Sequence, residues 1–304
     1  QLNASAGQMA AILADAAAPA DLRAQALRLM GARHRQDPAF ARALNSALAT
    51  NAADELYRTG LDFLVPDAID RLVREARTAL TSRATPTRQH VLALLGKAAH
   101  PAADAVLADQ AKTLVAGTYP AELQLDLLEA LRARESAHRP IAEALARYGT
   151  TPAAEARQEL LAGGDPVRGR DIGINHLGGN CLACHKLESA EGSQVGPSLR
   201  NIGRERDAAS LLQSLINPGA VVAPGYGIVS ISLHDGTLLG GALAQETPEA
   251  VTLRLVDGTE QRIERSRIAS LTPPISVMPP MEGILQPREL RDLVAYLQSL
   301  RTRR

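Results

Sequence analysis

Two cysteines and a histidine stand together in residues 180–199, NCLACHKLESAEGSQVGPSL. Cys181 and Cys184 are the only cysteines of the 304-residue chain, and His185 follows directly. The pattern CxxCH is typical of c-type haem attachment. Two cysteines one helical turn apart can each form a thioether with a porphyrin vinyl group, and the next residue can present an imidazole to the iron. The spacing therefore predicts one covalently bound haem c, with His185 as the proximal iron ligand.

Three other sites could use the same residues. A redox-active dithiol is expected at a helix start that follows a core strand, but the preceding VRGRDIGINHLGG has no run of β-branched residues. A structural zinc site needs four Cys or His ligands, and the chain has no second cysteine pair. A disulfide between Cys181 and Cys184 would close a loop too short to add much stability. Haem attachment is the preferred interpretation.

A six-coordinate haem needs a second axial ligand, and the chain has only four methionines. Met9 and Met30 lie in the helical first half, where methionine usually fills a core. Met278 lies in SVMPPMEG, after the haem motif, and the prolines beside it limit the freedom of the loop. We therefore predict Met278 as the distal ligand, unless it packs on the porphyrin edge without binding iron. The alternative ligands are Met281 and His234.

The first half of the chain is rich in alanine and leucine at helical spacing. Similar segments recur about every 34 residues, and they start at Pro19, Asn51, Pro86 and Pro120. Their apolar doublets align at Leu29-Met30, Phe63-Leu64, Leu94-Leu95 and Leu127-Leu128. Second helices lie between them, from Asp37, Pro66 and Pro101. This periodicity predicts a HEAT-like α-solenoid over residues 1–150. The spacing would also suit a tetratricopeptide array, but the Trp and Tyr signature of that repeat is absent from this sequence. An irregular helical bundle is the remaining alternative.

The residue pattern changes after about residue 150, which predicts a linker at residues 151–164 and a second domain at 165–304. From Gly227 the pattern becomes β-branched alternation, with Asp-Gly pairs at 235–236 and 257–258 that are typical of hairpin turns. It predicts an antiparallel sheet of about four strands, inserted at about 226–271. The chain closes on an amphipathic helix, PRELRDLVAYLQSLR. The expected fold class is mainly α with a small β insertion.

Composition excludes several classes of partner. Lysine plus arginine and aspartate plus glutamate both total 33, so no net charge attracts nucleic acid or an anionic membrane. Aromatic residues are 2% of the chain and tryptophan is absent, which argues against an aromatic platform for sugars or bases. No apolar run approaches the roughly 20 residues of a transmembrane helix. The chain begins at Gln1 without a signal-like segment, so we expect a processed product or a piece of a longer protein.

Residues from about 165 to 300 resemble a known family. The run from DPVRGRDIGINHLGGNCLACHKLES through VGPSL to SVMPPMEGILQPRELRDLVAYL is similar to the haem-binding cytochrome c domain typical of Planctomycetes and Verrucomicrobia. The resemblance implies a class I-like cytochrome c fold with a β-rich insertion before the methionine loop. In that family the domain often follows helical repeats and a sugar dehydrogenase-like β-propeller in one large secreted polypeptide. The resemblance assigns the thioethers to Cys181 and Cys184, and it assigns the axial positions to His185 and Met278.

The resemblance also implies how the haem motif is supported. The carbonyl of Pro197 should accept the imidazole N–H of His185, which fixes the ring and raises its basicity. The last helix, with Tyr296, should cross the first helix of the domain near Gly169, where the missing side chain allows close approach. The family commonly has an aromatic residue four positions later, where this chain has Gly173. The side chains expected to fill that gap are Ile172 or Ile174.

Polar residues near the motif have weaker assignments. Tyr226, in APGYG, is expected to contact the haem, and the nearby basic residues could bind its propionates. Ordinary solvated side chains are an equal interpretation for those arginines, which are Arg200, Arg204 and Arg206. His176 precedes the motif too closely to compete with His185, so we expect a surface or propionate-side histidine.

Together these features predict one-electron transfer through a His/Met-ligated haem. The expected electron donor is a sugar or alcohol dehydrogenase, as a fused domain or a partner protein, with the repeats as spacer and docking surface. Attachment of haem through thioethers takes place outside the bacterial cytoplasm, so a periplasmic or extracellular location is expected. An open iron site would instead suit a peroxidase or gas sensor. A protein-interaction solenoid with a secondary haem is the other alternative.

Overall fold

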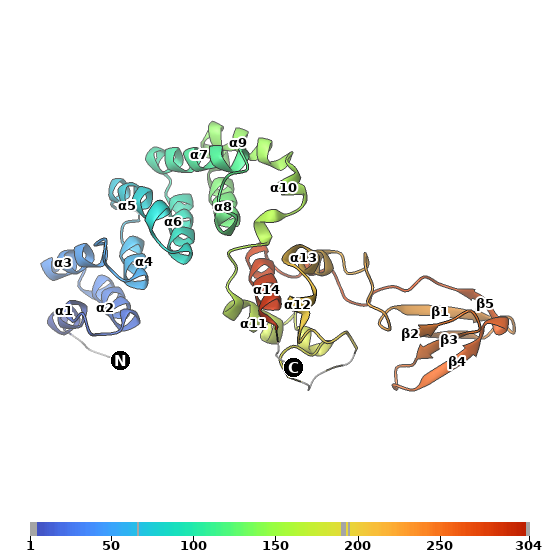
Figure 1. The fold of residues 1–304 in the computed structure, drawn as a ribbon. Coiled ribbons are helices and arrows are strands. Elements are labelled where there is room, and N and C mark those ends of the chain that lie inside the picture. Colours follow the sequence, from blue (N-terminus) through green and yellow to red (C-terminus); the bar gives the residue numbers. More distant parts are fainter. Residues whose placement is uncertain (1–4, 66, 190–192, 194, 302–304) are drawn as a thin grey trace. The chain divides into compact units, whose positions relative to one another are not determined.

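The chain forms two compact units, Gln1–Glu159 and Leu160–Arg304 (Figure 1). The computed structural model describes residues 5–65, 67–189, 193 and 195–301. This part is mainly helical with one small antiparallel sheet, which confirms the expected mainly-α class. The division falls inside the predicted linker at 151–164, but that segment is not extended, because it contains the short helices α10 (Pro152–Glu155) and η3 (Gln158–Leu160).

The first unit consists of short helices joined by tight connections. Proline occupies the first turn of several of them, where its missing N–H costs nothing. The longer helices are α1 (Ala6–Ala14), α2 (Ala20–Arg33), α3 (Pro38–Ala47), α4 (Asp54–Asp62), α5 (Ile69–Ser82), α6 (Thr85–Lys97), α7 (Pro101–Val115), α8 (Gln124–Arg134) and α9 (Arg139–Gly149). Two 3-10 turns, η1 (Ala121–Leu123) and η2 (Glu135–Ala137), flank α8.

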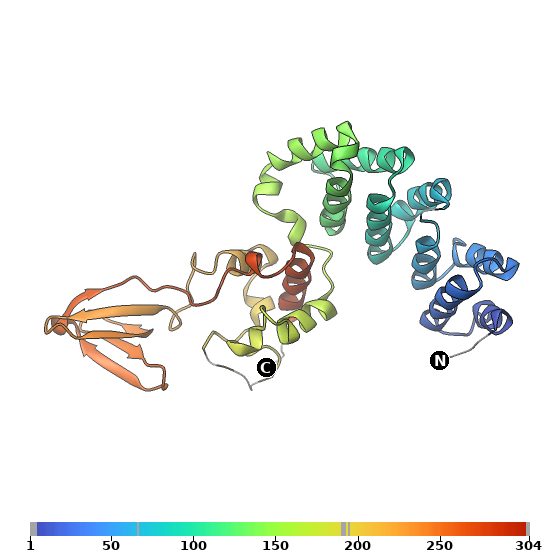
Figure 2. The same ribbon diagram turned by 180° about the vertical axis from the view of Figure 1, so that it is seen from behind.

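These helices pack in two rows. Helices α2, α4, α6 and α8 each contact the next in one row, and α5, α7 and α9 do so in a second row. Figures 1 and 2 show both rows from opposite sides. The four recurring segments of the sequence form the first row. The second member of each apolar doublet is at most 1% exposed, and these residues are Met30, Leu64, Leu95 and Leu128. The periodicity in the sequence therefore corresponds to a repeated packing position.

A repeated hydrogen bond also joins neighbouring helices of the first row. An arginine in each of α2, α4 and α6 donates to a side chain about one repeat later in the sequence. The bonds are Arg28 Nη2 to Thr59 Oγ1 (3.0 Å), Arg58 Nη1 to Thr87 Oγ1 (3.3 Å) and Arg88 Nη1 to Glu122 Oε1 (3.5 Å). Both threonines are at most 1% exposed, so these bonds satisfy buried hydroxyl groups.

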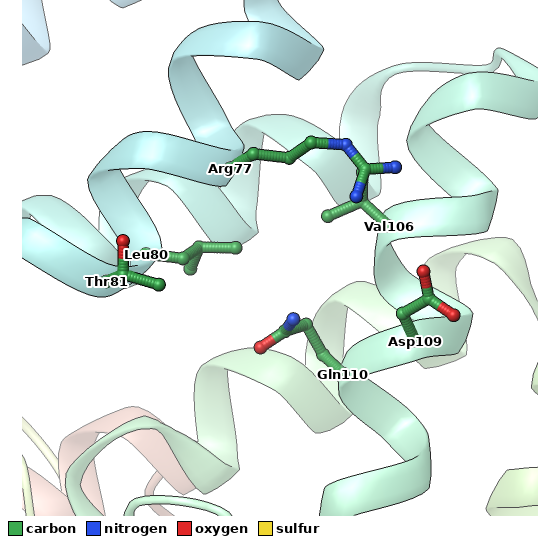
Figure 3. Close-up of a pocket in the computed structure, with 6 residues that line it drawn as sticks. All are labelled: Arg77, Leu80, Thr81, Val106, Asp109 and Gln110. Carbon is green, nitrogen blue, oxygen red and sulfur yellow. The ribbon is translucent and has the colours of Figure 1, made fainter.

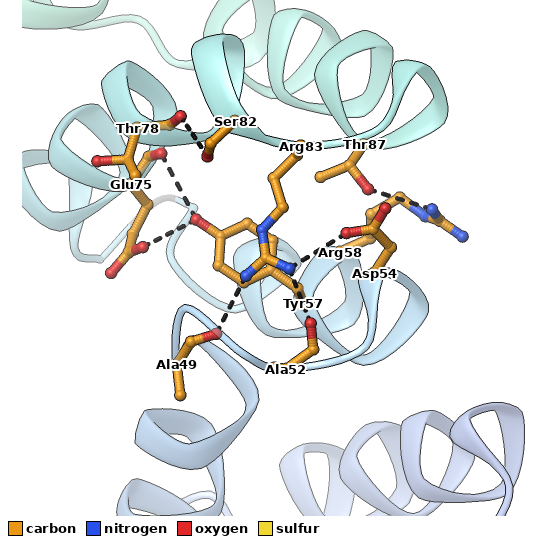
Figure 4. A network of polar contacts seen from close by, with 10 residues as sticks. All are labelled: Ala49, Ala52, Asp54, Tyr57, Arg58, Glu75, Thr78, Ser82, Arg83 and Thr87. Carbon is orange, nitrogen blue, oxygen red and sulfur yellow. Dashed lines mark hydrogen bonds and ion pairs between the residues drawn. The ribbon is translucent and has the colours of Figure 1, made fainter.

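Arg83 connects the end of α5 to the turn between α3 and α4 (Figure 4). Its guanidinium carbon lies 4.0 Å from the centre of the Tyr57 ring. The same group donates to the carbonyl oxygens of Ala49 (3.0 Å) and Ala52 (2.7 Å), and it pairs with Asp54 (3.2 Å). Because the Arg83 side chain is only 12% exposed, water cannot easily replace these bonds.

We expect Arg83→Met to lower the free energy of unfolding by about 2–4 kcal/mol, since it removes the Arg83 donor to the Ala52 carbonyl and the ion pair with Asp54. The control is Arg139→Met, whose side chain is 88% exposed in its pair with Glu143. That change should cost less than about 0.5 kcal/mol. Urea unfolding followed by far-ultraviolet circular dichroism compares the two, and equal losses would contradict the role given to Arg83.

The second unit brings together helices from both of its ends. Its helical elements are α11 (Pro166–Asn175), η4 (Cys181–Ala183), α12 (Ile202–Glu205), α13 (Ala208–Ile216), η6 (Met281–Gly283) and α14 (Pro287–Ser299). The Asp165 side chain caps α11 by accepting from the backbone N–H groups of its first turn. Helices α11 and α14 pack closely against each other, and α12, α13 and η6 also contact α14.

Helices α11 and α14 cross closely at Gly169, as the family resemblance implied. A Cβ atom at Gly169 would lie 1.9 Å from the carbonyl oxygen of Asp292 and 2.8 Å from Cβ of Tyr296. At Gly173, a Cβ atom would lie 3.4 to 3.7 Å from the side chains of Tyr296, Leu293 and Leu187. These side chains lie at the place of the missing aromatic residue. Ile172 and Ile174 are both half-buried, and their expected part in filling the gap stays a prediction.

The sheet has five strands in the described residues rather than the four expected. They are β1 (Ile228–Leu233), β2 (Leu238–Glu246), β3 (Ala250–Arg254), β4 (Glu260–Glu264) and β5 (Ile268–Leu271), in the antiparallel order β4-β3-β2-β1-β5. The Asp-Gly turns join β1 to β2 and β3 to β4, with positive φ at Gly236 and Gly258. The alternation of residues did not predict β5, because this strand follows the 3-10 turn η5 (Arg265–Arg267) and returns to pair with β1.

The sheet has a core of its own. Val229, Ile231 and Leu253 are at most 1% exposed and cluster with other side chains of the same strands. Across the described residues of both units, no helix is long and apolar enough to cross a bilayer.

Candidate functional site

The CxxCH segment forms a single helical turn. The backbone N–H groups of Cys184 and His185 donate to the carbonyl oxygen of Cys181, at 3.1 and 2.7 Å. Both cysteines are half-buried free thiols, so they form no disulfide in this structure. Burial raises the pKa of the Cys181 thiol to about 11. A reactive dithiol requires the opposite shift, so this environment does not favour the redox alternative.

The imidazole of His185 is held by the loop that contains Gly196 and Pro197. Its Nδ1 lies 2.7 Å from the carbonyl oxygen of Pro197, as the family resemblance implied. A carbonyl can only accept, so Nδ1 carries a proton, and Nε2 is the nitrogen that has a lone pair in the neutral imidazole. A Cβ atom at Gly196 would lie 2.5 Å from Cε1 of His185, and the Gly196 N–H donates to the Cys184 carbonyl (2.7 Å). The loop therefore orients the ring with Nε2 as its available ligand atom.

Met278 lies half-buried in the loop after the sheet. Its backbone N–H donates to Ser276 Oγ at 3.2 Å, and Ile275 forms a β-bridge with Ile228. Met281 is instead 5% exposed, in η6, which packs on α13 and α14. His234 is exposed at the end of β1, beside the β1–β2 turn. Of the three candidates for the distal ligand, Met278 is therefore the one with neither a core role nor a position at the β1–β2 turn.

Large apolar side chains point into solvent on the same loops. Leu177 precedes the CxxCH turn, Val195 precedes Gly196, and Val277 precedes Met278; their exposed fractions are 102%, 59% and 58%. Each of the three stands within four residues of a candidate residue along the chain and is available to contact a bound apolar group. The thiols, the Nε2 lone pair, the thioether and these apolar groups all fit a haem c.

The other candidate residues lie in separate surroundings. The Tyr226 ring lies 5.9 Å from the guanidinium carbon of Arg254 on β3, and the described part of the chain gives it no bond to the CxxCH turn. Arg204 and Arg206 are exposed and Arg200 is half-buried. The structure therefore brings together Cys181, Cys184, His185 and Pro197, whereas it places Tyr226 against the sheet.

His176 has a structural role before the haem motif. Its Nδ1 accepts the backbone N–H groups of Gly178 (3.2 Å) and Gly179 (2.9 Å). Its Nε2 lies 3.8 Å from a carboxylate oxygen of Glu289 on α14. His176 thus shapes the turn that leads into Cys181.

Two cavities lie in the first unit, away from this motif. One, of about 180 Å³, lies between α5 and α7 and is lined by Arg77, Leu80, Thr81, Val106, Asp109 and Gln110 (Figure 3). It is smaller than the roughly 300–1,000 Å³ of most ligand pockets. The other, of about 540 Å³, contains the buried carboxylate of Glu159. That carboxylate already accepts bonds from Arg157 Nε (3.2 Å) and the Tyr148 hydroxyl (3.4 Å).

No protein-family model matches the chain, and no curated protein matches it. Within the described ranges, no group of three or more His, Cys, Asp or Glu side chains is arranged to hold a metal ion, which gives the zinc alternative no support. Gly196 was missed by sequence reasoning, although its place beside Pro197 was a usable signal.

Proposed function

We propose that residues 160–304 form a class I-like cytochrome c domain that holds one covalent haem c and transfers single electrons. The observation that carries the proposal is the hydrogen bond from His185 Nδ1 to Pro197 beside a CxxCH helical turn. When bound, the haem supplies a one-electron ferric/ferrous couple. The Cys181 and Cys184 thiols would anchor it, and His185 Nε2 and Met278 Sδ would hold the iron.

The protein groups around the site suit a carrier of electrons. The Pro197 carbonyl raises the basicity of His185 and fixes its ring. If the Met278 thioether held the iron, it would favour the ferrous state and so raise the reduction potential, which suits an acceptor of electrons. Gly196 brings the backbone against the imidazole and leaves little room for the ring to turn.

The first unit is proposed to be a HEAT-like solenoid. Its two rows of helices, its repeated buried doublets and its Arg-to-Thr bonds between successive helices support that proposal. Such an array offers a surface for docking a redox partner or a fused dehydrogenase that oxidises a sugar or alcohol. Thioether attachment of haem places the protein in the periplasm or outside the cell.

The test compares wild type, Met278→Ala and Met281→Leu, each expressed with periplasmic cytochrome c maturation. We expect covalent haem in all three and a ferric sulfur-to-iron charge-transfer band in wild type and Met281→Leu only. The reduction potential of Met278→Ala should fall by on the order of 0.1 V or more, because axial ligands set haem potentials over a range of about 0.8 V. Optical spectra and redox titration measure both effects.

Two results would contradict the proposal. A wild-type protein without covalent haem after proper maturation would remove its basis. A high-spin wild-type spectrum that shifts with carbon monoxide would show an open iron position, and it would favour a peroxidase or gas sensor over an electron carrier.

A further inference from the structure

A carboxylate joins the segment after His185 to two helices. Glu188 lies three residues beyond His185. Arg170 on α11 donates to it through Nε (2.7 Å) and Nη2 (2.9 Å), one bond to each carboxylate oxygen. The Tyr296 hydroxyl on α14 donates a third bond, at 3.0 Å. Glu188 is therefore the point at which α11, α14 and the haem-motif segment are connected.

The two donors are held in place without Glu188. Arg170 directly follows Gly169, the residue at which α11 and α14 come closest. Tyr296 lies at the same crossing and packs its ring beside Gly173. The helix crossing therefore presents a guanidinium and a hydroxyl in fixed positions, and the segment after His185 attaches to them.

Each residue from 185 to 188 has a separate anchor. His185 donates to Pro197, and the carbonyl of Lys186 accepts the Leu199 N–H at 2.8 Å. Leu187 is 1% exposed in the core. Glu188 is the fourth anchored residue. Of the four, it is the one whose side chain forms hydrogen bonds with side chains of α11 and α14.

The electrostatics show what the connection does. The Arg170 bonds hold the pKa of Glu188 below its usual value, so the carboxylate is charged at neutral pH and accepts from both donors. Burial, and then Glu188 itself, raise the pKa of Tyr296, so its hydroxyl keeps its proton. The Arg170 and Glu188 side chains are 52% and 43% exposed, however, and such pairs add little to overall stability. We therefore expect Glu188 to affect the direction of segment 185–188 more than the free energy of unfolding.

We propose that Glu188 is a positioning residue that fixes the direction of segment 185–188 and thereby the orientation of the His185 imidazole. This inference rests on the proposed function for what His185 binds. The positioning itself is a property of the polypeptide and can be measured with or without haem.

The test uses the full chain and compares Glu188→Gln with Glu246→Gln. Glu246 pairs with Arg265 in the sheet and is also 43% exposed, so the control removes an equivalent charge elsewhere. We expect the backbone amides of Leu199 and Gly196 to exchange with deuterium about three- to tenfold faster in Glu188→Gln and at the wild-type rate in Glu246→Gln. Melting temperatures should change by no more than about 3 °C in either variant.

A second variant separates positioning from packing. Tyr296→Phe keeps the ring beside Gly173 and removes only the hydroxyl, so it should speed exchange at Leu199 less than Glu188→Gln does. In haem-loaded protein, Glu188→Gln should also shift the ferric electron paramagnetic resonance g values, which report ligand orientation. Unchanged exchange at Leu199 and Gly196 in Glu188→Gln would overturn the inference, whether or not haem is bound. Faster exchange in protein without covalent haem would support positioning and contradict only the proposed function.

Discussion

Gly169→Ala is expected to destabilise the second unit by about 3 kcal/mol or more, the upper range for overpacking a tight core. A Cβ atom there would lie 1.9 Å from the carbonyl oxygen of Asp292 and 2.5 Å from its carbonyl carbon. These are backbone atoms of α14, so no side-chain rotation relieves the clash, and α11 and α14 must move apart. Helix propensity alone predicts the opposite sign, since alanine is favoured over glycine by about 1 kcal/mol.

Differential scanning calorimetry of the full chain measures this effect. The transition of the second unit should fall by roughly 6–12 °C, from about 2–4 °C per kcal/mol for a protein of this size. Gly219→Ala is the control, because nothing lies within 4 Å of a Cβ atom there and its φ is not positive. A Gly169→Ala protein as stable as wild type would show that the helices do not cross as described.

Gly196→Ala is expected to displace the His185 imidazole without unfolding the unit. The new Cβ atom would lie 2.5 Å from Cε1 and 2.7 Å from Nδ1 of His185. The ring would turn away from Pro197 and lose the bond that sets its protonation and direction. Loss of such an outer partner weakens a metal site by about 10- to 100-fold, so we expect matured protein to contain a large high-spin fraction.

Two measurements check this expectation. Nitrogen-15 NMR should show the His185 Nδ1–H as slowly exchanging in wild type and as fast-exchanging in Gly196→Ala. Optical spectra of the matured variant, beside Gly219→Ala as the control, report the spin state. If Gly196→Ala keeps a wild-type low-spin spectrum and a protected Nδ1–H, the close contact between Gly196 and the ring is not required.

Local features of the chain were readable from its sequence. The CxxCH turn depends only on hydrogen bonds within residues Cys181 to His185, and helical geometry sets the spacing of these residues. The Asp-Gly turns followed from the need for positive φ at Gly236 and Gly258. The helical periodicity was visible because the same buried position returns in every second helix, as Leu95 in α6 and Leu128 in α8 show.

Contacts between distant segments were predicted only where the family resemblance supplied them. The bond between His185 and Pro197 and the crossing at Gly169 are examples. Where the chain departs from the family pattern at Gly173, the prediction chose a neighbour in sequence, Ile172 or Ile174. The structure also brings side chains from distant segments against Gly173, namely those of Leu187, Leu293 and Tyr296, because a space inside a core is closed by whichever element packs across it.

The helical periodicity, the hairpin turns and the CxxCH motif were predictable from the amino-acid sequence, since each depends on residues within a few positions of one another. The return of β5 to β1, the contact of Gly196 with His185 and the bonds of Glu188 to Arg170 and Tyr296 became evident in the folded chain alone. Tyr296 stands 108 residues from Glu188, and no local pattern of residue types encodes which surface α14 will meet. That choice follows from the packing of the whole unit, in which a missing side chain at Gly169 lets two helices come close enough to share a third segment.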